Sequence, residues 1–299
     1  MEERLRADVK AGYACNNNCL FCVVADKRRH GDLTTGKVKK QLDASWENGA
    51  RSVVLTGGEV TIRKDVFDLV SHAKKCGFEN IQIQTNARML SNLDFAKKLV
   101  GAGANVFAPA LHGCNAKMHD YLVQCKGAFN QTLEGIKNAK LLGVPVLSNT
   151  VVTKPNFEHV EEIARILIDL EAESCQLAFV HANGNAWDNF DLIVPPISRA
   201  SVFIKKALRE GKNTRTKMMV EAVPPCLMTG FEQYCSEKFI PKTEVRAPDY
   251  FTKDFEKERK EEGKCKGENC KKCALFKSCE GPWKEYPQKR GWKEFKPVH

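Results

Sequence analysis

The chain has 299 residues, of which 42% are hydrophobic and 28% are charged, and its formal net charge is +10. These values are typical of a globular protein with the size of one α/β barrel and an appendage. No apolar run approaches the ~20 residues that cross a bilayer, and the charged segment Met1–Lys10 lacks the apolar core of a signal peptide. We therefore expect a cytoplasmic protein without a membrane partner.

The thirteen cysteines gather in two clusters. Three lie within residues 15–22 and six within residues 226–279. Because the cytosol keeps thiols reduced, we expect these clusters to hold inorganic centres and not disulfides. The isolated cysteines, which are typical of buried thiols, are Cys76, Cys114, Cys125 and Cys175.

The first cluster follows a predicted strand over residues 5–14. Cys15, Cys19 and Cys22 are separated by three and two residues, so a short loop brings three thiolates together with little loss of chain entropy. A closed zinc or iron–sulfur site normally takes four protein ligands. Three ligands therefore indicate a centre with one position open to a substrate or cofactor, although a zinc loop or three core thiols is the alternative.

Strands and helices alternate along the next part of the chain. Short, β-branched apolar runs such as residues 52–56 are typical of buried parallel strands, and the segments between them show helical spacing. The further predicted strands are residues 52–56, 80–85, 105–111, 146–152 and 174–180. The predicted helices are residues 36–48, 65–76, 92–101, 129–142, 159–170 and 198–210. Six strands in this order predict an α/β fold with a parallel sheet, either a partial barrel or an open sheet.

The second predicted strand ends in Gly57-Gly58-Glu59. In parallel α/β sheets, ligands gather at the carboxyl ends of the strands. Two glycines at that place allow the backbone to approach a ligand closely, and Glu59 supplies an anion. This stretch is therefore a candidate ligand site.

The C-x3-C-x2-C spacing, followed one β/α unit later by Gly-Gly-Glu, resembles the radical S-adenosylmethionine (SAM) enzymes. The resemblance covers about residues 8–210 and implies a partial (β/α)6 TIM-like barrel. It implies that Cys15, Cys19 and Cys22 hold a [4Fe–4S] cluster whose open iron chelates SAM. It further implies an oxidoreductase- or transferase-type enzyme that cleaves SAM reductively and abstracts hydrogen from a substrate, with flavodoxin or ferredoxin as the electron donor.

The same resemblance assigns residues to the SAM site. Residues 57–59 match the motif that contacts the SAM amino group, and Phe21 is expected beside the adenine. The other residues expected to bind SAM are Thr61, Thr85, Asn86, Ser148 and Asn149.

Two histidines at predicted strand ends are candidates for proton transfer. The fourth strand ends in Ala110-Leu111-His112-Gly113, where peptide-modifying members often have Ser-Leu-Asp-Gly. The sixth strand ends near His181, where relatives form the adenine pocket. For His112, the alternative is an ordinary polar residue at a strand end, so the catalytic residue stays open.

Beyond residue 210 the alternation stops, and we interpret residues 211–299 as a second, small domain. Residues 216–223 are expected to form a strand of that unit, and residues 241–264 a linker or exposed helix. The tail from Cys265 is too polar for a core of its own, so it needs a metal centre to fold.

The pattern Cys270-x2-Cys273-x5-Cys279 resembles the SPASM and Twitch extensions, which hold auxiliary iron–sulfur clusters. The SPASM pattern continues with a cysteine where this chain has Trp283, so we expect one auxiliary [4Fe–4S] cluster in the Twitch style. Its expected ligands are Cys270, Cys273 and Cys279, with Cys265, Cys235 or Cys226 as the fourth. A zinc ribbon is the alternative.

Residues 251–299 hold fourteen Lys or Arg against nine Asp or Glu, and aromatic residues lie among them. Such a tail can contact nucleic acid or an acidic electron donor, or it can be a solvated and packed surface. Auxiliary clusters often accompany peptide modification in the family, so we expect a peptide or protein substrate. The alternatives are modification of a nucleoside, RNA or a small cofactor precursor and, from another class, a zinc-containing nucleic-acid-binding protein.

Overall fold

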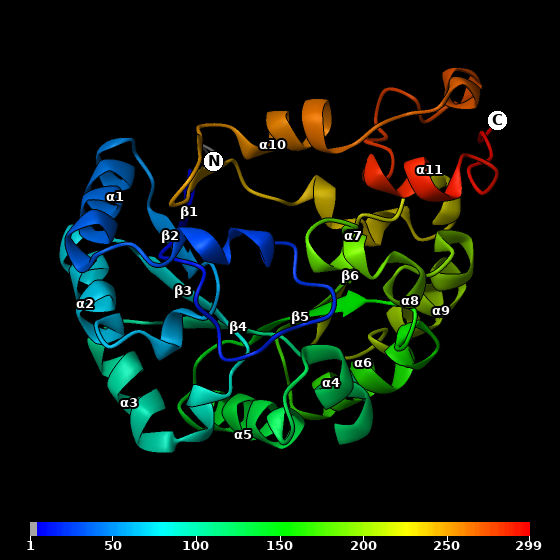
Figure 1. Cartoon of the computed structure of the whole chain (residues 1–299). Coiled ribbons are helices and arrows are strands. Elements are labelled where there is room, and N and C mark those ends of the chain that lie inside the picture. Colours follow the sequence, from blue (N-terminus) through cyan, green and yellow to red (C-terminus); the bar gives the residue numbers. More distant parts are fainter. Residues whose placement is uncertain (1–4) are drawn as a thin grey trace.

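The computed structural model describes residues 5–299, and the first four residues of the charged N-terminal segment lie outside the described part. Figure 1 shows a curved sheet surrounded by helices. The nine strands are β1 (Arg6–Lys10), β2 (Ser52–Thr56), β3 (Asn80–Thr85), β4 (Val106–Pro109), β5 (Leu147–Val152), β6 (Ser174–Phe179), β7 (Lys217–Glu221), β8 (Thr243–Arg246) and β9 (Phe251–Thr252). The α-helices are α1 (Thr35–Glu47), α2 (Val66–Cys76), α3 (Leu93–Ala102), α4 (Ala116–Val123), α5 (Ala128–Leu141), α6 (Val160–Asp169), α7 (Asn185–Asp188), α8 (Phe190–Ile193), α9 (Ile197–Glu210), α10 (Phe255–Glu258) and α11 (Glu285–Arg290).

The strands form two sheets in the orders β4-β3-β2-β1-β8-β9 and β5-β6-β7. Every pair is parallel except β8 with β9. Isolated parallel bridges from Phe107 to Val146 and from Ala110 to Asn149 connect β4 to β5. The curved parallel sheet and its outer helices confirm the predicted α/β fold of partial-barrel type.

The helices begin and end where their terminal residues satisfy the free backbone groups. The Thr34 side chain accepts a hydrogen bond from Lys37 N at the start of α1, and Asn115 caps α4 in the same way. Helix α2 ends at Gly77, whose φ of 103° suits a residue without a Cβ. Only α4 and the short helices α7, α8, α10 and α11 were not predicted from periodicity, because each is at most eight residues long.

The sheet continues beyond residue 210. Strand β7 pairs in parallel with β6, and β8 pairs in parallel with β1 on the opposite side of the barrel. Residues 216–223 therefore extend the barrel and do not form a strand of a separate unit. The division of the chain at residue 210 stays a prediction.

Strand β8 lies inside the segment that was predicted to be a linker or exposed helix. Its residues Thr243, Glu244 and Val245 are 1–3% exposed. Glu244 is a charged residue in a buried strand, and it is tolerated because Ser45 Oγ (2.5 Å) and Asn48 Nδ2 (3.1 Å) of the α1 region donate to its carboxylate. Because Glu244 interrupts the apolar pattern that is typical of a buried strand, sequence analysis did not predict β8.

The tail packs across one end of the barrel, where α10 and α11 lie in Figure 1. Tyr286 of α11 is 1% exposed, stacks edge-on against Phe179 of β6, and its hydroxyl accepts a hydrogen bond from Ile197 N (2.8 Å). Phe295 is also buried. These two aromatic residues are therefore core residues and cannot stack on bases. Within residues 5–299, no helix has the length and apolarity to cross a membrane.

Candidate functional site

One open cavity of about 470 Å³ lies at the carboxyl ends of the barrel strands. The last residues of four strands line it, namely Thr56 of β2, Thr85 of β3, Phe179 of β6 and Glu221 of β7. This volume is ordinary for a small-molecule site, and this end of a parallel barrel is where ligands bind. The predicted location of the site is therefore matched by a real cavity.

The cysteine loop, residues 15–22, enters this cavity, and all three of its thiols line the wall. Arg88, which follows β3, donates from Nη1 to Asn16 O (2.5 Å) and Asn17 Oδ1 (2.9 Å). Asn185 at the start of α7 donates from Nδ2 to Cys19 O (2.8 Å). The fold thus fixes the loop through its backbone and asparagines, which leaves the thiols free to bind a ligand.

The three thiols of the loop are not all close enough together to share one metal ion in this conformation. Sulfur ligands on a single tetrahedral zinc lie only about 3.8 Å apart, because each Zn–S bond is about 2.3 Å. In the described chain, only Asp43, His72 and Cys76 form a group of three with all ligand atoms within 4.8 Å of one another. The cysteine loop therefore spreads its sulfurs more widely than a single ion requires.

Burial raises the pKa of Cys15 and of Cys19, so both are thiols in the metal-free protein. Two groups nevertheless favour a negative charge at this place. Asn17 N donates to Cys15 Sγ at 3.4 Å, and the Arg28 guanidinium lines the same cavity and lowers the pKa of both thiols in part. Binding of a cluster here would release protons and gain an amide donor and a cation.

The Glu59 carboxylate connects the ends of β2 and β3 through hydrogen bonds. It is 2% exposed, and its carboxylate accepts hydrogen bonds from Thr85 Oγ1 (2.7 Å), Asn86 N (2.6 Å) and Thr61 N (3.1 Å). Burial raises the pKa of Glu59, and these donors counteract the rise only in part. The three predicted residues Thr61, Thr85 and Asn86 therefore meet at Glu59, and only Thr85 and Asn86 also line the cavity with it.

The two glycines before Glu59 pack closely on the backbone before the cysteine loop. A Cβ on Gly57 would lie 2.1 Å from Gly12 O, and one on Gly58 would lie 2.1 Å from Ala14 O. Gly58 N and Glu59 N donate to these same carbonyls at 2.9 and 2.8 Å. The glycines thus allow the motif to pack on the backbone that leads into the cysteine loop, although both also line the cavity.

The predicted pair on β5 is divided between two environments. Asn149 lines the cavity, and its Oδ1 is a buried acceptor without a partner in the described chain. Ser148 instead donates from Oγ to Pro109 O (3.1 Å) and does not line the cavity. Successive side chains of a strand point to opposite faces, so only one of the two can reach the ligand. The orphan acceptor of Asn149 fits a ligand that carries N–H donors.

Phe21 and His112 form one wall of the cavity, with ring centroids 4.8 Å apart in an edge-on arrangement. Val151 N donates to His112 Nδ1 at 3.1 Å, which places the ring hydrogen on Nε2. Burial, and then the neighbouring His119, lowers the pKa of His112 to about 3. His112 is therefore a neutral ring that offers a hydrogen-bond donor at Nε2.

His181 also lines the cavity and is oriented by the tail. Its Nε2 is 3.0 Å from Glu285 Oε2 of α11, and its ring stacks on Trp283 at 4.0 Å. Trp283 itself lines the cavity, as does Phe255. Residues far beyond the predicted barrel thus complete the site.

Sequence reasoning missed Glu221, which also lines the cavity. Burial, followed by repulsion from Glu237, raises the pKa of this carboxyl group, and Gln176 Nε2 donates to its Oε2 at 2.5 Å. Its signal was an acidic residue at the end of a strand, but that strand was placed outside the barrel. Sequence reasoning also missed Arg28 as a residue that lines the cavity.

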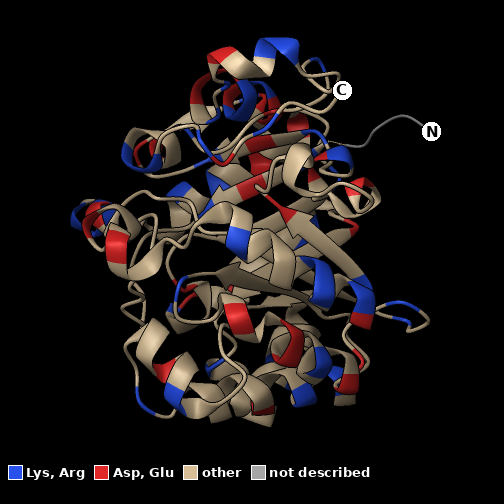
Figure 2. Cartoon of the chain, turned by 90° about the vertical axis from the view of Figure 1, so that its right-hand side faces the viewer, with Lys and Arg blue, Asp and Glu red and all other residues tan. Residues whose placement is uncertain are grey.

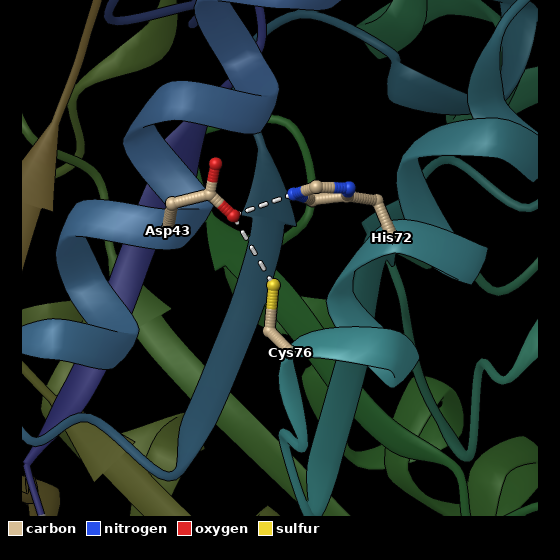
Figure 3. A group of neighbouring side chains, drawn as sticks. All are labelled: Asp43, His72 and Cys76. Atoms are coloured by element: carbon tan, nitrogen blue, oxygen red, sulfur yellow. Dashed lines mark hydrogen bonds and ion pairs between the residues drawn. The ribbon is translucent and has the colours of Figure 1, made fainter.

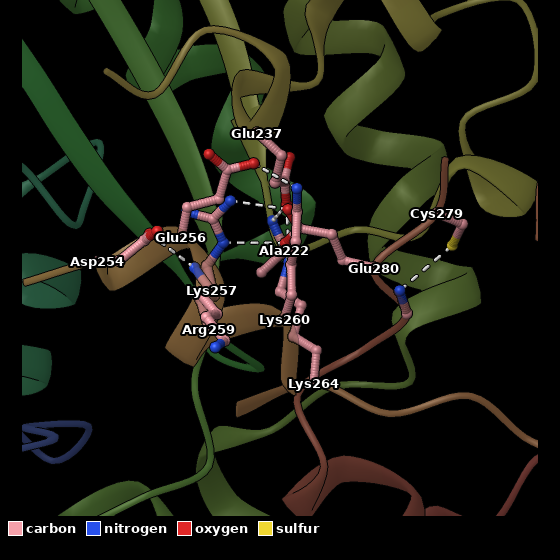
Figure 4. A network of polar contacts seen from close by, with 11 residues as sticks. Ala222, Glu237, Asp254, Glu256, Lys257, Arg259, Lys260, Lys264, Cys279 and Glu280 are labelled. Atoms are coloured by element: carbon pink, nitrogen blue, oxygen red, sulfur yellow. Dashed lines mark hydrogen bonds and ion pairs between the residues drawn. The ribbon is translucent and has the colours of Figure 1, made fainter. Parts of the chain in front are cut away.

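A buried ionic network joins the tail to the end of β7 (Figure 4). Lys264 Nζ lies 2.9 Å from Glu237 Oε1 and 3.3 Å from Glu280 Oε2, and Arg259 pairs with Glu280 at 2.7 Å. Glu237 also accepts a hydrogen bond from the backbone of Ala222 (2.8 Å), next to Glu221. Two cations and two anions balance one another, so the tail is fixed at the edge of the cavity.

The cysteines of the tail lie at a second, small and largely apolar cavity, which four of them line. These four are Cys226, Cys270, Cys273 and Cys279. Val298 N donates to Cys273 Sγ, and Gly281 N to Cys279 Sγ, both at 3.3 Å.

Cys265 and Cys235 do not line this second cavity. Cys235 is instead 4% exposed within the hydrophobic core. Burial, and then the neighbouring thiols, raises the pKa of Cys226 to about 11. Cys226 is therefore the candidate fourth ligand that the structure brings to Cys270, Cys273 and Cys279.

A family model described as "Radical SAM superfamily" matches residues 9–167. Two curated relatives are similar in sequence. The AdoMet-dependent heme synthase of Methanosarcina barkeri is 30% identical over 60% of this chain and 52% of the relative. The GTP 3′,8-cyclase of Peptoclostridium acidaminophilum is 31% identical over 53% of this chain and 50% of the relative. The chain thus spans about half the length of the curated relatives it matches.

Similar folds occur among solved structures. SuiB of Streptococcus suis, solved with S-adenosylmethionine, aligns with a TM-score of 0.67, 16% identity, and coverage of 98% of this chain and 76% of SuiB. SuiB bound to its precursor peptide SuiA aligns with a TM-score of 0.66. At this identity the likeness concerns the fold.

Proposed function

Because the chain belongs to the radical SAM superfamily, and is thus an enzyme that uses SAM and a [4Fe–4S] cluster, we propose that its substrate is a peptide or protein. When bound, the cluster and SAM supply the oxidising power that removes a hydrogen atom from the substrate. The chain's own residues bind, orient and enclose the reacting groups. The substrate, the residue roles and the second cluster are the points that we propose.

We assign the cluster ligands to Cys15, Cys19 and Cys22, which line the wall of the main cavity. Arg28 supplies a cation beside them, which would raise the reduction potential of a negatively charged cluster. Asn149 offers its free Oδ1 to the N–H groups of SAM, and Phe21 offers an aromatic edge to its adenine. Glu59 holds the ends of β2 and β3 in place so that these groups face one another.

The proposal for the substrate rests on the charged residues that line the cavity. Among the described residues, Arg28 is the only Lys or Arg that lines it, whereas Glu59 and Glu221 are both carboxylic acids. A triphosphate such as that of GTP is a polyanion, and proteins bind such groups with several cations. The single arginine lies beside the proposed cluster ligands, so the cavity suits a neutral or cationic group. Peptide side chains and backbone supply such groups.

Two further observations support a peptide. The fold of SuiB, which was solved with a precursor peptide, matches 98% of this chain, including the tail. In the tail, acidic residues lie among the basic ones along the chain, and Figure 2 shows both colours on the ribbon near the C-terminus. Such a mixed distribution offers less attraction to RNA than a basic stripe would.

We also propose that residues 211–299 hold an auxiliary [4Fe–4S] cluster in the Twitch style, with Cys226, Cys270, Cys273 and Cys279 as ligands. No three of these sulfurs lie within 4.8 Å of one another, which disfavours a single zinc ion. Two amide donors to sulfur and the nearby Lys266 and Lys296 stabilise a negatively charged cluster. Four protein ligands leave no open iron, so this cluster would transfer electrons or fix the tail. A flavodoxin or ferredoxin would supply the electrons.

The test is an anaerobic assay of the reconstituted enzyme with SAM and dithionite. Peptides encoded beside its gene are compared with GTP, and 5′-deoxyadenosine and the peptide masses are measured. We expect a peptide to increase SAM cleavage and to change in mass, while GTP has no effect. Stimulation by GTP, with no change in any peptide, would contradict the proposed substrate.

A further inference from the structure

A second group of metal-ligand side chains lies between helices α1 and α2, outside the main cavity (Figure 3). Asp43 belongs to α1, and His72 and Cys76 belong to α2. Asp43 Oδ1 is 2.6 Å from His72 Nε2 and 3.4 Å from Cys76 Sγ, and all three ligand atoms lie within 4.8 Å of one another. We propose that Asp43, His72 and Cys76 bind one zinc ion that connects α1 to α2.

The sequence places the ligands suitably for a single ion. His72 and Cys76 are four residues apart, so both side chains project from the same face of α2, one turn apart. Helix α1 supplies the third ligand from the opposite side. The same spacing on one helix face is used by two-histidine zinc sites.

The helix pair is fixed on both sides of this group. One turn earlier, Lys39 of α1 pairs with Asp68 of α2 at 2.6 Å. One turn later, Trp46 packs so closely on Gly77 that a Cβ there would lie 2.8 Å from the indole ring. The backbones of all three ligands are therefore held in place before any ion binds, which lowers the entropic cost of forming a site.

The chemistry of the donors selects zinc. Nitrogen, sulfur and oxygen ligands suit Zn²⁺, whereas Mg²⁺ and Ca²⁺ prefer oxygen alone. Three protein ligands leave the fourth tetrahedral position to water. The side chains of Asp43 and His72 are 47% and 25% exposed, so the ion can enter from solvent.

A nucleophilic site is the other arrangement that such residues form. In a Cys–His–acid site the histidine contacts the thiol, and the acid orients the histidine. Here the carboxylate of Asp43 lies between the other two and contacts both (Figure 3). This order fits a shared cation and does not activate the thiol.

The test uses the reconstituted holoenzyme, equilibrated with Zn²⁺ in a chelator buffer. Zinc and iron contents are measured, together with zinc-edge X-ray absorption. We expect one zinc per chain, with one sulfur at about 2.3 Å and the remaining nitrogen and oxygen ligands at about 2.0 Å. His72→Gln and Cys76→Ser should each weaken zinc binding at least ~10-fold with unchanged iron, because each removes a direct ligand.

His159→Gln is the matched control, since His159 Nδ1 lies 3.3 Å from Glu162 on the exposed surface and these two residues belong to no described group of three ligand atoms within 4.8 Å of one another. It should leave zinc binding unchanged. A zinc surrounded by four sulfurs would place the ion at the tail cysteines and would overturn the proposal, as would equal zinc uptake by the wild type and the two variants. SAM cleavage by His72→Gln should be normal. The zinc site and the proposed substrate are therefore tested independently of one another.

Discussion

The two cysteine regions of this molecule look alike in sequence and differ in their surroundings. The loop of residues 15–22 brings three thiols to the wall of a cavity of about 470 Å³ that polar side chains also line. Cys226 and three cysteines of the tail line a small cavity whose walls are mainly proline, leucine and phenylalanine. A centre with an open coordination site needs space for a second ligand, whereas a closed centre needs only to be covered. This difference agrees with the roles that we propose, a SAM-binding cluster in the first region and an auxiliary cluster in the second.

The two regions also differ in how they are held. The first loop is fixed by side chains of the barrel, among them Arg88 and Asn185. The tail is fixed by a buried ionic network through Arg259 and Lys264, and by the aromatic core around Tyr286. Because His181 is hydrogen-bonded to Glu285, the tail also orients a residue that lines the main cavity.

The largest difference is expected from removal of a ligand in the first loop. Cys19→Ala should abolish SAM cleavage, with a loss of at least ~100-fold, because the loss of a direct ligand exceeds that of an outer partner. The measurement is 5′-deoxyadenosine released with dithionite. Cys175→Ala, which alters an isolated buried thiol, is the control and should retain activity. Normal cleavage by Cys19→Ala would remove the assignment of the reactive cluster.

The tail should lose its iron without loss of the reactive centre. Cys226→Ser should lower the iron content from about eight to about four per chain, and the signal of the SAM-binding cluster should persist in electron paramagnetic resonance. Cys265→Ser should keep all its iron, because Cys265 does not line the tail cavity. The reverse pattern would make Cys265 the fourth ligand. Four irons together with one sulfur-bound zinc in the wild type would make the tail a zinc module.

Acid should lower the free energy of unfolding through two buried histidines near the cysteine loop. Burial lowers the pKa of His112 to about 3 and that of His119 to about 4. Between these values and the unfolded pKa near 6.5, the unfolded state binds more protons, so the free energy of unfolding falls as the pH falls. From pH 6.5 to 5 the loss is about 2 kcal/mol for each histidine.

Denaturant unfolding of the wild type and of His119→Gln across this pH range checks the expectation. The substitution should flatten the pH dependence by up to one proton. An equally steep curve for the variant would show that His119 is not the titrating group.

The smallest effect is expected within the SAM site itself. Asn149→Ala should weaken SAM binding about tenfold, which corresponds to about 1.4 kcal/mol, because the N–H groups of SAM would lose the acceptor that Asn149 Oδ1 offers. Ser148→Ala should leave the affinity unchanged, since its hydroxyl contacts Pro109 O. Equilibrium binding of SAM to both variants makes the comparison. A larger loss for Ser148→Ala would contradict the division of β5 into two faces.

The sequence alone determined the order of the strands and of the longer helices in the first two thirds of the chain, whereas α4, α7 and α8 were not predicted. Strands β2 and β3 coincide with the predicted residues 52–56 and 80–85, because β-branched apolar runs between helical segments have few other uses. The sequence also selected the motifs that we propose to carry the chemistry, since three thiols and a Gly-Gly-Glu at a strand end are local patterns. The sequence did not show which residues these motifs contact in the folded protein.

The tertiary structure decided the rest, because it concerns residues that are distant along the chain. Strand β8 joins β1 across more than two hundred residues, and its buried Glu244 accepts hydrogen bonds from Ser45 and Asn48 of the α1 region as well as from Arg246. Likewise, Cys226 is set beside Cys270 by folding, and no spacing rule distinguishes it from Cys235 or Cys265. Local sequence fixes backbone preference and ligand chemistry, whereas burial, charge balance and the choice among similar residues depend on the packed whole.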